Sequence, residues 1–294
     1  MARFARLKFP AVMPLVAMLT ALCFFGGCAS ARPVLELQNT VIDGEARWSG
    51  TVLVSGVVTV KKGGSLTILP GTRVLFERID LDGDGIGDSE LLVEGRISVL
   101  GTAEQPVLFT SAEEQPRPAD WKYLYLDFAK PSQIEHLVSE YAYSGIQVHF
   151  CRARIVDSVF RHNVDGVRFS TVRLELAGNR IHGNRHGLRY EERRSEANIH
   201  HNDIRDNDIG VFVVTRSEDR ARIEQNNIAG NRQYNVKIGL AQQGDVTFPG
   251  NWWGTSDEEK IAGGFFDRQY DETLGRVRAP SPLPGPVNIE QHAE

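Results

Sequence analysis

The sequence predicts an all-β protein built as a solenoid of stacked coils, and three observations support this prediction. Similar segments recur between residues 155 and 253 at intervals of 21, 23, 24 and 25 residues. Within each segment apolar residues alternate with polar ones, which is the period of a strand and not of a helix. The short strands are separated by Asn and Gly, which tolerate the left-handed backbone of tight corners.

Residues 1–27 are predicted to be a lipoprotein signal peptide. Three basic residues, the last of them Lys8, precede an uncharged run that ends in Phe25-Gly-Gly-Cys28. This is the basic, apolar and small-residue order of a secretory signal, and a transmembrane anchor is the alternative. The end of the run resembles the lipobox of bacterial lipoproteins, although Phe25 departs from its usual aliphatic residue. The resemblance implies that Cys28 is acylated. Because Ala29 replaces the Asp that marks inner-membrane retention, it also implies an outer-membrane lipoprotein that faces the periplasm or the surface.

Composition narrows the possible functions. The chain has 33 Lys and Arg against 38 Asp and Glu, and removal of the signal peptide takes three basic residues, which leaves a net charge of 30 − 38 = −8. An acidic, exported chain is a poor candidate for nucleic-acid binding. Only Cys28 and Cys151 would remain, so neither a disulfide framework nor a CxxC motif is expected.

The repeat predicts which residues stack. A unit reads I-x-x-N-x-I-x-x-N-x-x-G-I-x-Φ, where Φ is apolar. Because like residues lie above like in a solenoid, apolar columns should fill the interior and Asn columns should bond along the stack. The predicted columns are Ile155, Leu176, Ile199, Ile223 and Phe248; Phe160, Ile181, Ile204, Ile228 and Trp253; Asn163, Asn184, Asn207 and Asn231; and Gly166, Gly187 and Gly210.

The N-terminal half fits the same plan with longer coils. The segment Gly64–Thr72 is answered by Gly95–Thr102, and Val74-Leu-Phe76 is answered by Val107-Leu-Phe109. We therefore expect a linker or cap at 28–48, coils at 49–255, and a C-terminal cap with a Pro-rich tail at 256–294. The tail Pro280–Pro286 is expected to be extended and poorly ordered.

From about Val52 to Thr255 the chain resembles the right-handed parallel β-helix repeat proteins, the class that includes the pectate lyases. The phrases G-x-L-x-I-x-P-G-T-x-V-x-F and P-V-L-F-T-S resemble the opening coils of bacterial members, and Asn251-Trp-Trp-Gly-Thr255 resembles their last coil. The resemblance implies a single-stranded right-handed parallel β-helix with a hairpin insertion near its N-terminal end. It says little about activity, because one fold supports many functions. A helical solenoid is the structural alternative.

The hairpin insertion is a candidate metal site. Acidic residues occupy every second position with Gly at the turn, a pattern that suits calcium. The segment resembles the first part of an EF-hand loop and then departs from it, since Leu91 stands where the closing acid belongs. We expect a structural calcium ion, with a solvated Asp-Gly turn as the alternative. The candidate ligands are Asp80, Asp82, Asp84, Asp88 and Glu90.

Cations aligned by the repeat form the candidate binding surface. Stacked cations on an acidic protein suit an acidic polysaccharide or the phosphate of a lipopolysaccharide, unless acids such as Asp165 and Glu175 pair with them. Insertions enter at one corner, at 191–196 and 215–220. Insertions on one edge of a solenoid often form its binding face, but the mixed charges here favour a self-paired, charged solvent edge. Trp252 should lie outside, where it stacks on a sugar or caps the last coil. The candidate residues are Arg168, Arg189 and Lys237 in one column, Arg161, His182 and Arg205 in another, and Trp252.

These features predict a non-catalytic, outer-membrane-anchored module that binds a glycan or an envelope protein, and stands as a monomer. No outward stack of carboxylates is apparent and we name no catalytic residue, but a polysaccharide lyase or glycoside hydrolase is the alternative. A third option is metal handling, as in the β-helix maturation protein of periplasmic nitrous oxide reductase. No clustered Met, His and Cys set supports it, because the histidines do not share one column, and Cys151 reads as a small buried residue.

Overall fold

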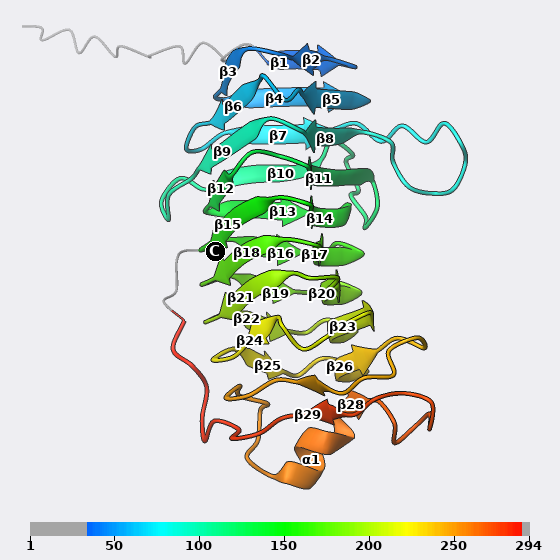
Figure 1. Ribbon diagram of the computed structural model, residues 1–294. Helices are drawn as coiled ribbons and strands as arrows, with labels where there is room; N and C mark the ends of the chain where they lie inside the picture. Colours follow the sequence, from blue (N-terminus) through cyan, green and yellow to red (C-terminus); the bar gives the residue numbers. More distant parts are fainter. Residues whose placement is uncertain (1–33, 290–294) are drawn as a thin grey trace, which may run out of the picture. The chain divides into compact units, whose positions relative to one another are not determined.

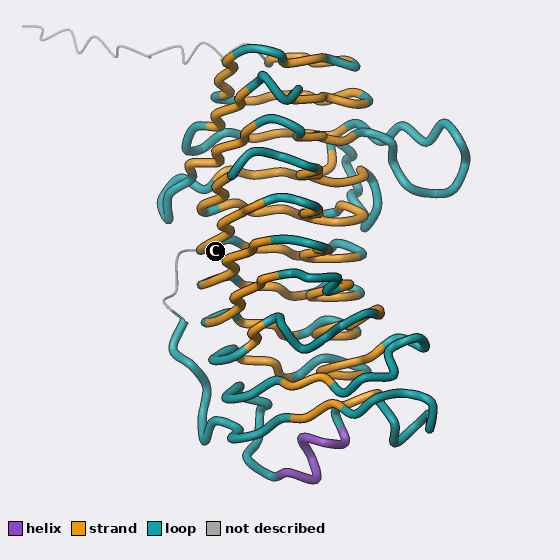
Figure 2. Tube along the Cα trace, in the orientation of Figure 1, coloured by secondary structure: helices purple, strands orange, loops and turns teal. Residues whose placement is uncertain are grey.

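The computed structural model describes residues 34–289, and these residues form a right-handed parallel β-helix, as the sequence predicts (Figure 1). Most of the strands fall into three parallel sheets, and from β1 to β26 every third strand along the chain is a neighbour in the same sheet. Strands and short corners alternate around each coil (Figure 2). The predicted signal peptide and Cys28 lie outside the described residues.

The nine-stranded sheet contains, in order, β1 Leu35–Gln38, β4 Thr51–Ser55, β7 Arg73–Phe76, β10 Val107–Ser111, β13 Leu137–Glu140, β16 Val159–Arg161, β19 Arg180–His182, β22 Asp203–Arg205 and β25 Asn227–Ala229. The ten-stranded sheet contains β2 Val41–Ile42, β5 Val57–Val60, β8 Glu90–Val93, β11 Trp121–Asp127, β14 Ala142–His149, β17 Asp165–Ser170, β20 His186–Glu191, β23 Ile209–Thr215, β26 Tyr234–Ile238 and β28 Phe265–Phe266.

The eight-stranded sheet contains β3 Glu45–Trp48, β6 Ser65–Ile68, β9 Arg96–Leu100, β12 Ser132–Glu135, β15 Arg152–Val156, β18 Arg173–Ala177, β21 Glu196–His200 and β24 Arg222–Ile223. A short pair, β27 Val246–Thr247 and β29 Val277–Arg278, lies near the C-terminal end with the helix α1 Glu258–Gly263. Within the described residues no helix has the length and apolar character needed to cross a membrane.

The apolar columns form the core, because period-2 alternation turns every second side chain inward. Phe160, Ile181, Ile204 and Ile228 lie in register on four successive strands and are fully buried. Large aromatic residues also fill part of the core near the N-terminal end. There the Phe76 and Trp121 rings stack 4.1 Å apart, and an aromatic pair of this kind contributes beyond its buried area.

Two asparagine ladders hold the coils together at successive corners. In one of them Asn184 accepts the backbone N–H of Asn163 (2.9 Å), and its Nδ2 donates to the carbonyl of Phe160 and to Oδ1 of Asn207, both at 3.0 Å. The other ladder contains Asn179, Asn202, Asn226 and Asn251. These side chains are buried, and they satisfy corner amides and carbonyls that have no partner in a sheet.

Glycine beside the ladder allows neighbouring coils to approach closely. A Cβ atom on Gly187 would lie 2.7 Å from the carbonyl oxygen of Gly210 and 2.8 Å from Nδ2 of Asn207. Neither atom can move without breaking the ladder. The Gly column predicted from the repeat is therefore a packing requirement of the corner.

Both ends of the stack differ in detail from the predicted boundaries. Strands β1 to β3 complete a first coil that pairs with the second, so coil structure begins at Leu35 and not at 49. At the other end the Trp253 side chain packs inside against Phe265. The proline-rich tail is extended but fixed in place, because Asn227 exchanges two hydrogen bonds with the backbone of Val287 (3.0 and 2.8 Å).

The insertion near the N-terminal end is the protruding loop between β7 and β8 (Figure 1, cyan). The two flanking strands do not pair with each other. Strand β7 pairs with β4 and β10, whereas β8 pairs with β5 and β11. The loop is thus an enlarged corner of one coil, which explains how its acidic residues can protrude without disturbing the sheets.

Candidate functional site

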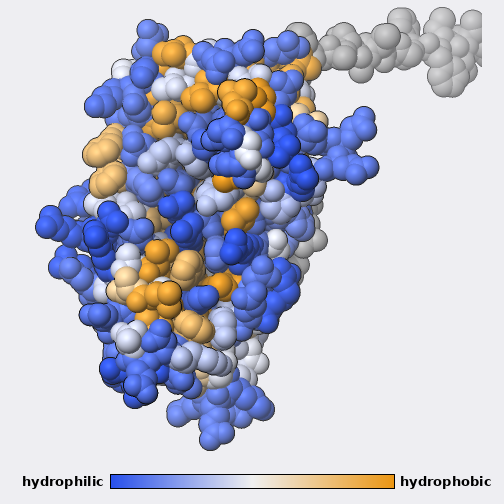
Figure 3. Space-filling model, turned by 90° about the vertical axis from the view of Figure 1, so that its right-hand side faces the viewer, coloured by the Kyte–Doolittle hydropathy of each residue, from blue (hydrophilic) through white to orange (hydrophobic). Residues whose placement is uncertain are grey.

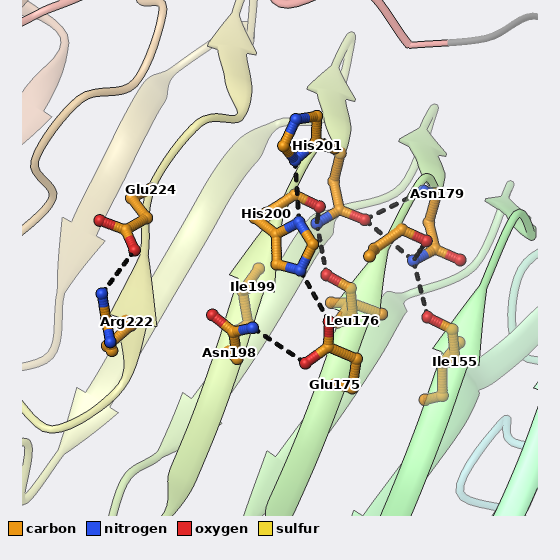
Figure 4. A network of polar contacts seen from close by, with 12 residues as sticks. Ile155, Glu175, Leu176, Asn179, Asn198, Ile199, His200, His201, Arg222 and Glu224 are labelled. Carbon is orange, nitrogen blue, oxygen red and sulfur yellow. Dashed lines mark hydrogen bonds and ion pairs between the residues drawn. The ribbon is translucent and has the colours of Figure 1, made fainter.

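Three side chains of metal-binding types contact one another on the eight-stranded sheet and at the corner that follows it. His200 is the last residue of β21, and His201 follows in a left-handed conformation (φ 54°). This turn brings the rings together, with Nδ1 of His200 2.8 Å from Nδ1 of His201 (Figure 4). Nε2 of His200 lies 2.7 Å from Oε1 of Glu175 on the neighbouring strand β18.

Glu175 determines which nitrogen of His200 carries a proton. Burial would raise the pKa of Glu175, but hydrogen bonds from Asn198 and His200 outweigh it and lower the pKa, so the carboxylate is ionised at neutral pH. An ionised carboxylate only accepts, and Nε2 of His200 must therefore donate. In the neutral ring this leaves a lone pair on Nδ1 of His200, directed at His201.

A second group lies on the outer face of the ten-stranded sheet. Arg168, Arg189, Phe212 and Lys237 occupy one register position on four successive strands, as the repeat predicts. The Arg189 guanidinium lies 5.9 Å from the centre of the Phe212 ring, and the Lys237 ammonium lies 4.9 Å from that of Phe266. Within residues 34–289 neither Arg168 nor Lys237 forms an ion pair.

Asp165 contacts two side chains of this face, Arg189 and His186. Its buried carboxylate accepts from Nη1 of Arg189 at 3.0 Å and lies 2.7 Å from Nδ1 of His186. Burial would raise the pKa of Asp165, but the hydrogen bond from His186 and the charge of Arg189 lower it. Burial would lower the pKa of Arg189, but the charge of Asp165 and its hydrogen bond raise it. Pairing of the column with Asp165, the alternative considered from the sequence, thus holds for Arg189.

The other predicted column is neutralised by acids. Arg161 pairs with Glu140 at 2.8 Å and Arg205 with Asp203 at 2.9 Å, on the nine-stranded sheet. His182 lies in register between them. Burial, followed by the charges of Arg161 and Arg205, lowers the pKa of His182, which makes it neutral at pH 7. The column of Arg161, His182 and Arg205 therefore carries less uncompensated positive charge than the column that contains Arg168 and Lys237.

The remaining candidates lie apart from both groups. Trp252 is half-buried and pairs through its backbone with Asn227 on the last full coil. Cys151 is also half-buried, and burial raises the pKa of its thiol to about 12. A thiol with such a pKa stays protonated and is a poor nucleophile or metal ligand at neutral pH.

The acidic loop brings together only part of the predicted ligand set. Carboxylate oxygens of Asp80, Asp82 and Asp84 lie within 4.8 Å of one another, whereas Asp88 and Glu90 are not in this group. The three carboxylates accept backbone amides of the loop itself, at 2.7 to 3.2 Å. Asp88 accepts the amide of Leu81 and pairs with Lys122 at 3.5 Å. The loop therefore stabilises its own turns through its acids.

Sequence reasoning did not identify the contact of Glu175 with His200. Its signal was the register between coils: a shift of 23 residues sets Glu175 opposite Asn198, and His200 lies two residues further on the same face. The repeat also set His186 beside Asp165, and the structure shows that the two side chains bond. The left-handed turn that brings His201 back onto His200 had no signal in the spacing.

Comparison with known protein families gives a match. A family model described as periplasmic copper-binding protein (NosD) matches residues 104–270, more than half of the chain. No curated protein and no solved structure matches. The matched residues include both groups described above and exclude the acidic loop at 77–89.

The prediction of a bound calcium ion is therefore wrong. The family is described by copper, and copper prefers nitrogen and sulfur ligands to a set made only of carboxylates. The physical reason for the error is that Asp at every second position also builds consecutive Asx turns. In this loop the carboxylates accept backbone amides and pair with Arg78 and Lys122.

Proposed function

The chain belongs to the NosD family, and from this membership we propose that it binds copper in the periplasm at the corner formed by His200 and His201. The observation that carries the proposal is the contact between two consecutive imidazoles, one of which is oriented by a carboxylate. It revives the metal-handling option that the sequence ranked third.

The side chains present fit copper(II) better than copper(I). No methionine follows Met18, and the thiol of Cys151 is protonated, so soft sulfur ligands are scarce. Imidazole and carboxylate suit copper(II), which also binds a given set of such ligands more tightly than the other divalent metals of its row. His200 and His201 supply the imidazoles, and Glu175 supplies a carboxylate that bonds to the ring of His200.

Each of the three residues has a separate part. His200 and His201 would hold the ion through the facing Nδ1 atoms. Glu175 acts as a positioning residue, because it accepts Nε2–H of His200 and keeps the lone pair of that ring on Nδ1. Copper bound there would be accessible to a partner protein, since His201 is exposed.

The test is titration of the purified, tag-free full chain with copper(II) and with zinc(II), followed by calorimetry. We expect the wild type to bind one copper ion more tightly than zinc. His200→Gln or His201→Gln should weaken copper binding by about 100-fold, and Glu175→Gln by about tenfold, the range seen when a partner of a ligand is removed.

His162→Gln is the matched control. His162 lies at another left-handed corner (φ 56°), where its ring stacks on that of Tyr141 with centres 5.6 Å apart. It should bind copper as the wild type does. If His162→Gln lost copper while His200→Gln kept it, the site would belong to the other corner, and failure of the wild type to bind copper would refute the proposal.

We further propose that the protein is anchored in the envelope by lipid on Cys28. The support is the order of basic, apolar and small residues before that cysteine. Cys28→Ala should move the protein from the membrane fraction to the soluble periplasmic fraction, because it removes the thiol that would carry the acyl chain. Cell fractionation with immunoblotting measures this, and a wild type found in the soluble fraction would contradict the anchor.

A second candidate function is binding of an acidic glycan by the outer face of the ten-stranded sheet. It is favoured by Arg168 and Lys237, cations that have no ion-pair partner among the described residues. Figure 3 looks at the side of the molecule on which this sheet is labelled in Figure 1. It shows hydrophobic residues gathered among hydrophilic ones, as expected of a surface that contacts sugar rings.

A further inference from the structure

We propose that a pocket on the outer face of the ten-stranded sheet binds the carboxylate-bearing sugars of an acidic glycan, that is, uronic-acid units. The inference rests on the second candidate function and names its site and ligand class; it does not depend on copper. The pocket has a volume of about 380 Å³, within the range of ligand sites, and its lining includes Tyr143, Arg185, His186, Arg189, Phe212 and Lys237.

The charges of the pocket leave two cations uncompensated. Each acid that lines it has its own arginine: Asp165 pairs with Arg189 (3.0 Å) and Asp208 with Arg232 (2.6 Å). Arg185 and Lys237 also line the pocket, and neither forms an ion pair with any residue in 34–289. An anion is the ligand that would compensate them.

One donor in the pocket wall also lacks a partner. Nε of Arg189 is buried and has no hydrogen-bond acceptor among the described residues, although Nη1 of the same guanidinium bonds to Asp165. Buried donors are almost always satisfied in folded proteins. The orientation of this guanidinium is fixed by Asp165 and by the Phe212 ring, so the side chain is already ordered when a ligand arrives.

Phe212 indicates that the anion is carried on a ring. It lies in register between Arg189 and Lys237, and its ring stacks on that of His186 with centres 5.1 Å apart. An aromatic face between two cations can contact the apolar face of a sugar while the cations bind its carboxylate. Inorganic phosphate would use the cations alone.

A neighbouring hollow extends the pocket along the sheet. It has a volume of about 200 Å³ and shares Arg189 with the first pocket, and Arg168 also lines it. Strands in a sheet are about 4.8 Å apart, so the column repeats its positions at a short, regular interval. Two hollows joined at one arginine suit an oligosaccharide more than a single sugar.

The experiment is calorimetric titration of the full chain with trigalacturonate, with its fully methyl-esterified form as the uncharged ligand. We expect the acid form to bind and the ester not to bind. The double variant Arg185→Gln/Lys237→Gln should bind at least tenfold more weakly, since hydrogen bonds to charged groups contribute enough for such a loss. Phe212→Leu, which keeps an apolar side chain, should also weaken trigalacturonate binding.

Lys62 and Lys130 are exposed and line neither hollow. The matched control Lys62→Gln/Lys130→Gln therefore removes the same charge away from the pocket and should change the affinity less than twofold. The pocket would be overturned if the control lost as much affinity as the double variant, or if the ester bound as well as the acid. It would also be overturned if inorganic phosphate displaced the trimer and bound Phe212→Leu as tightly as the wild type. Trigalacturonate that binds both double variants as it binds the wild type would refute this pocket but keep glycan binding, whereas no binding by the wild type would refute both. Copper titration of the same samples reports separately on His200 and His201.

Discussion

Glu192→Ala is expected to destabilise the protein by about 4 kcal/mol, because it removes the acceptor for a whole corner of the next coil. The Glu192 carboxylate is fully buried and accepts the backbone amides of Glu218, Arg220 and Ala221. It also accepts Oγ–H of Ser217 at 3.0 Å. Alanine would leave several buried donors without a partner, and each costs about 1–3 kcal/mol.

Glu191→Ala is the control for this prediction. Glu191 is adjacent in sequence but lies at the surface and pairs with Arg193 at 2.5 Å, so its loss should cost less than about 1 kcal/mol. Denaturant unfolding measures both variants, and hydrogen exchange at 216–221 should rise in Glu192→Ala alone. Similar losses in the two variants would show that the buried carboxylate does not hold the corner.

This corner also shows where sequence reasoning was wrong. The insertions at 191–196 and 215–220 were expected to be a charged solvent edge, and Glu191–Arg193 and Glu218–Arg220 do form such surface pairs. Glu192 differs because the enlarged corner of the following coil folds over it. Charge in an insertion does not reveal which acid will meet backbone amides, since that depends on the path of a loop without a repeat.

The fold itself was predictable because the repeat fixes the register. Once Phe160, Ile181, Ile204 and Ile228 are aligned, the remaining strand residues of those coils are also assigned their partners on the next coil. The column of Arg168, Arg189 and Lys237 follows from this alignment. The group formed by Glu175, His200 and His201 was harder to predict from the sequence. The register sets Glu175 near His200, but the contact with His201 needs a left-handed turn, which residues other than glycine adopt only occasionally and which the spacing does not indicate.

The asparagine ladder can be tested at a single rung. Asn184→Ala is expected to cost about 3 kcal/mol or more, because it removes the acceptor of the Asn163 amide and the side-chain donor to the carbonyl of Phe160 in a buried corner. Oδ1 of Asn207 would lose one of its donors and keep the backbone N–H of residue 184. Asn231 stands at the end of the same ladder and is half-buried. Water can replace its side chain there, so Asn231→Ala should cost about 1 kcal/mol in denaturant unfolding.

Asn184→Asp separates the two halves of the amide. The new carboxylate can still accept the amide of Asn163. In place of the wild-type Nδ2 donor, however, it turns an oxygen toward two acceptors, the carbonyl of Phe160 and Oδ1 of Asn207. Burial and these acceptors should raise the pKa of the new acid, so this variant should be least stable at neutral pH and should gain stability as the pH falls through that pKa, where the protonated acid donates again. If the stability of Asn184→Asp, compared with that of the wild type at each pH, did not rise toward acid pH, Nδ2 would not be the donor that joins the coils. The ladder then would act by shape alone, and Asn184→Ala and Asn184→Asp should differ little at any pH.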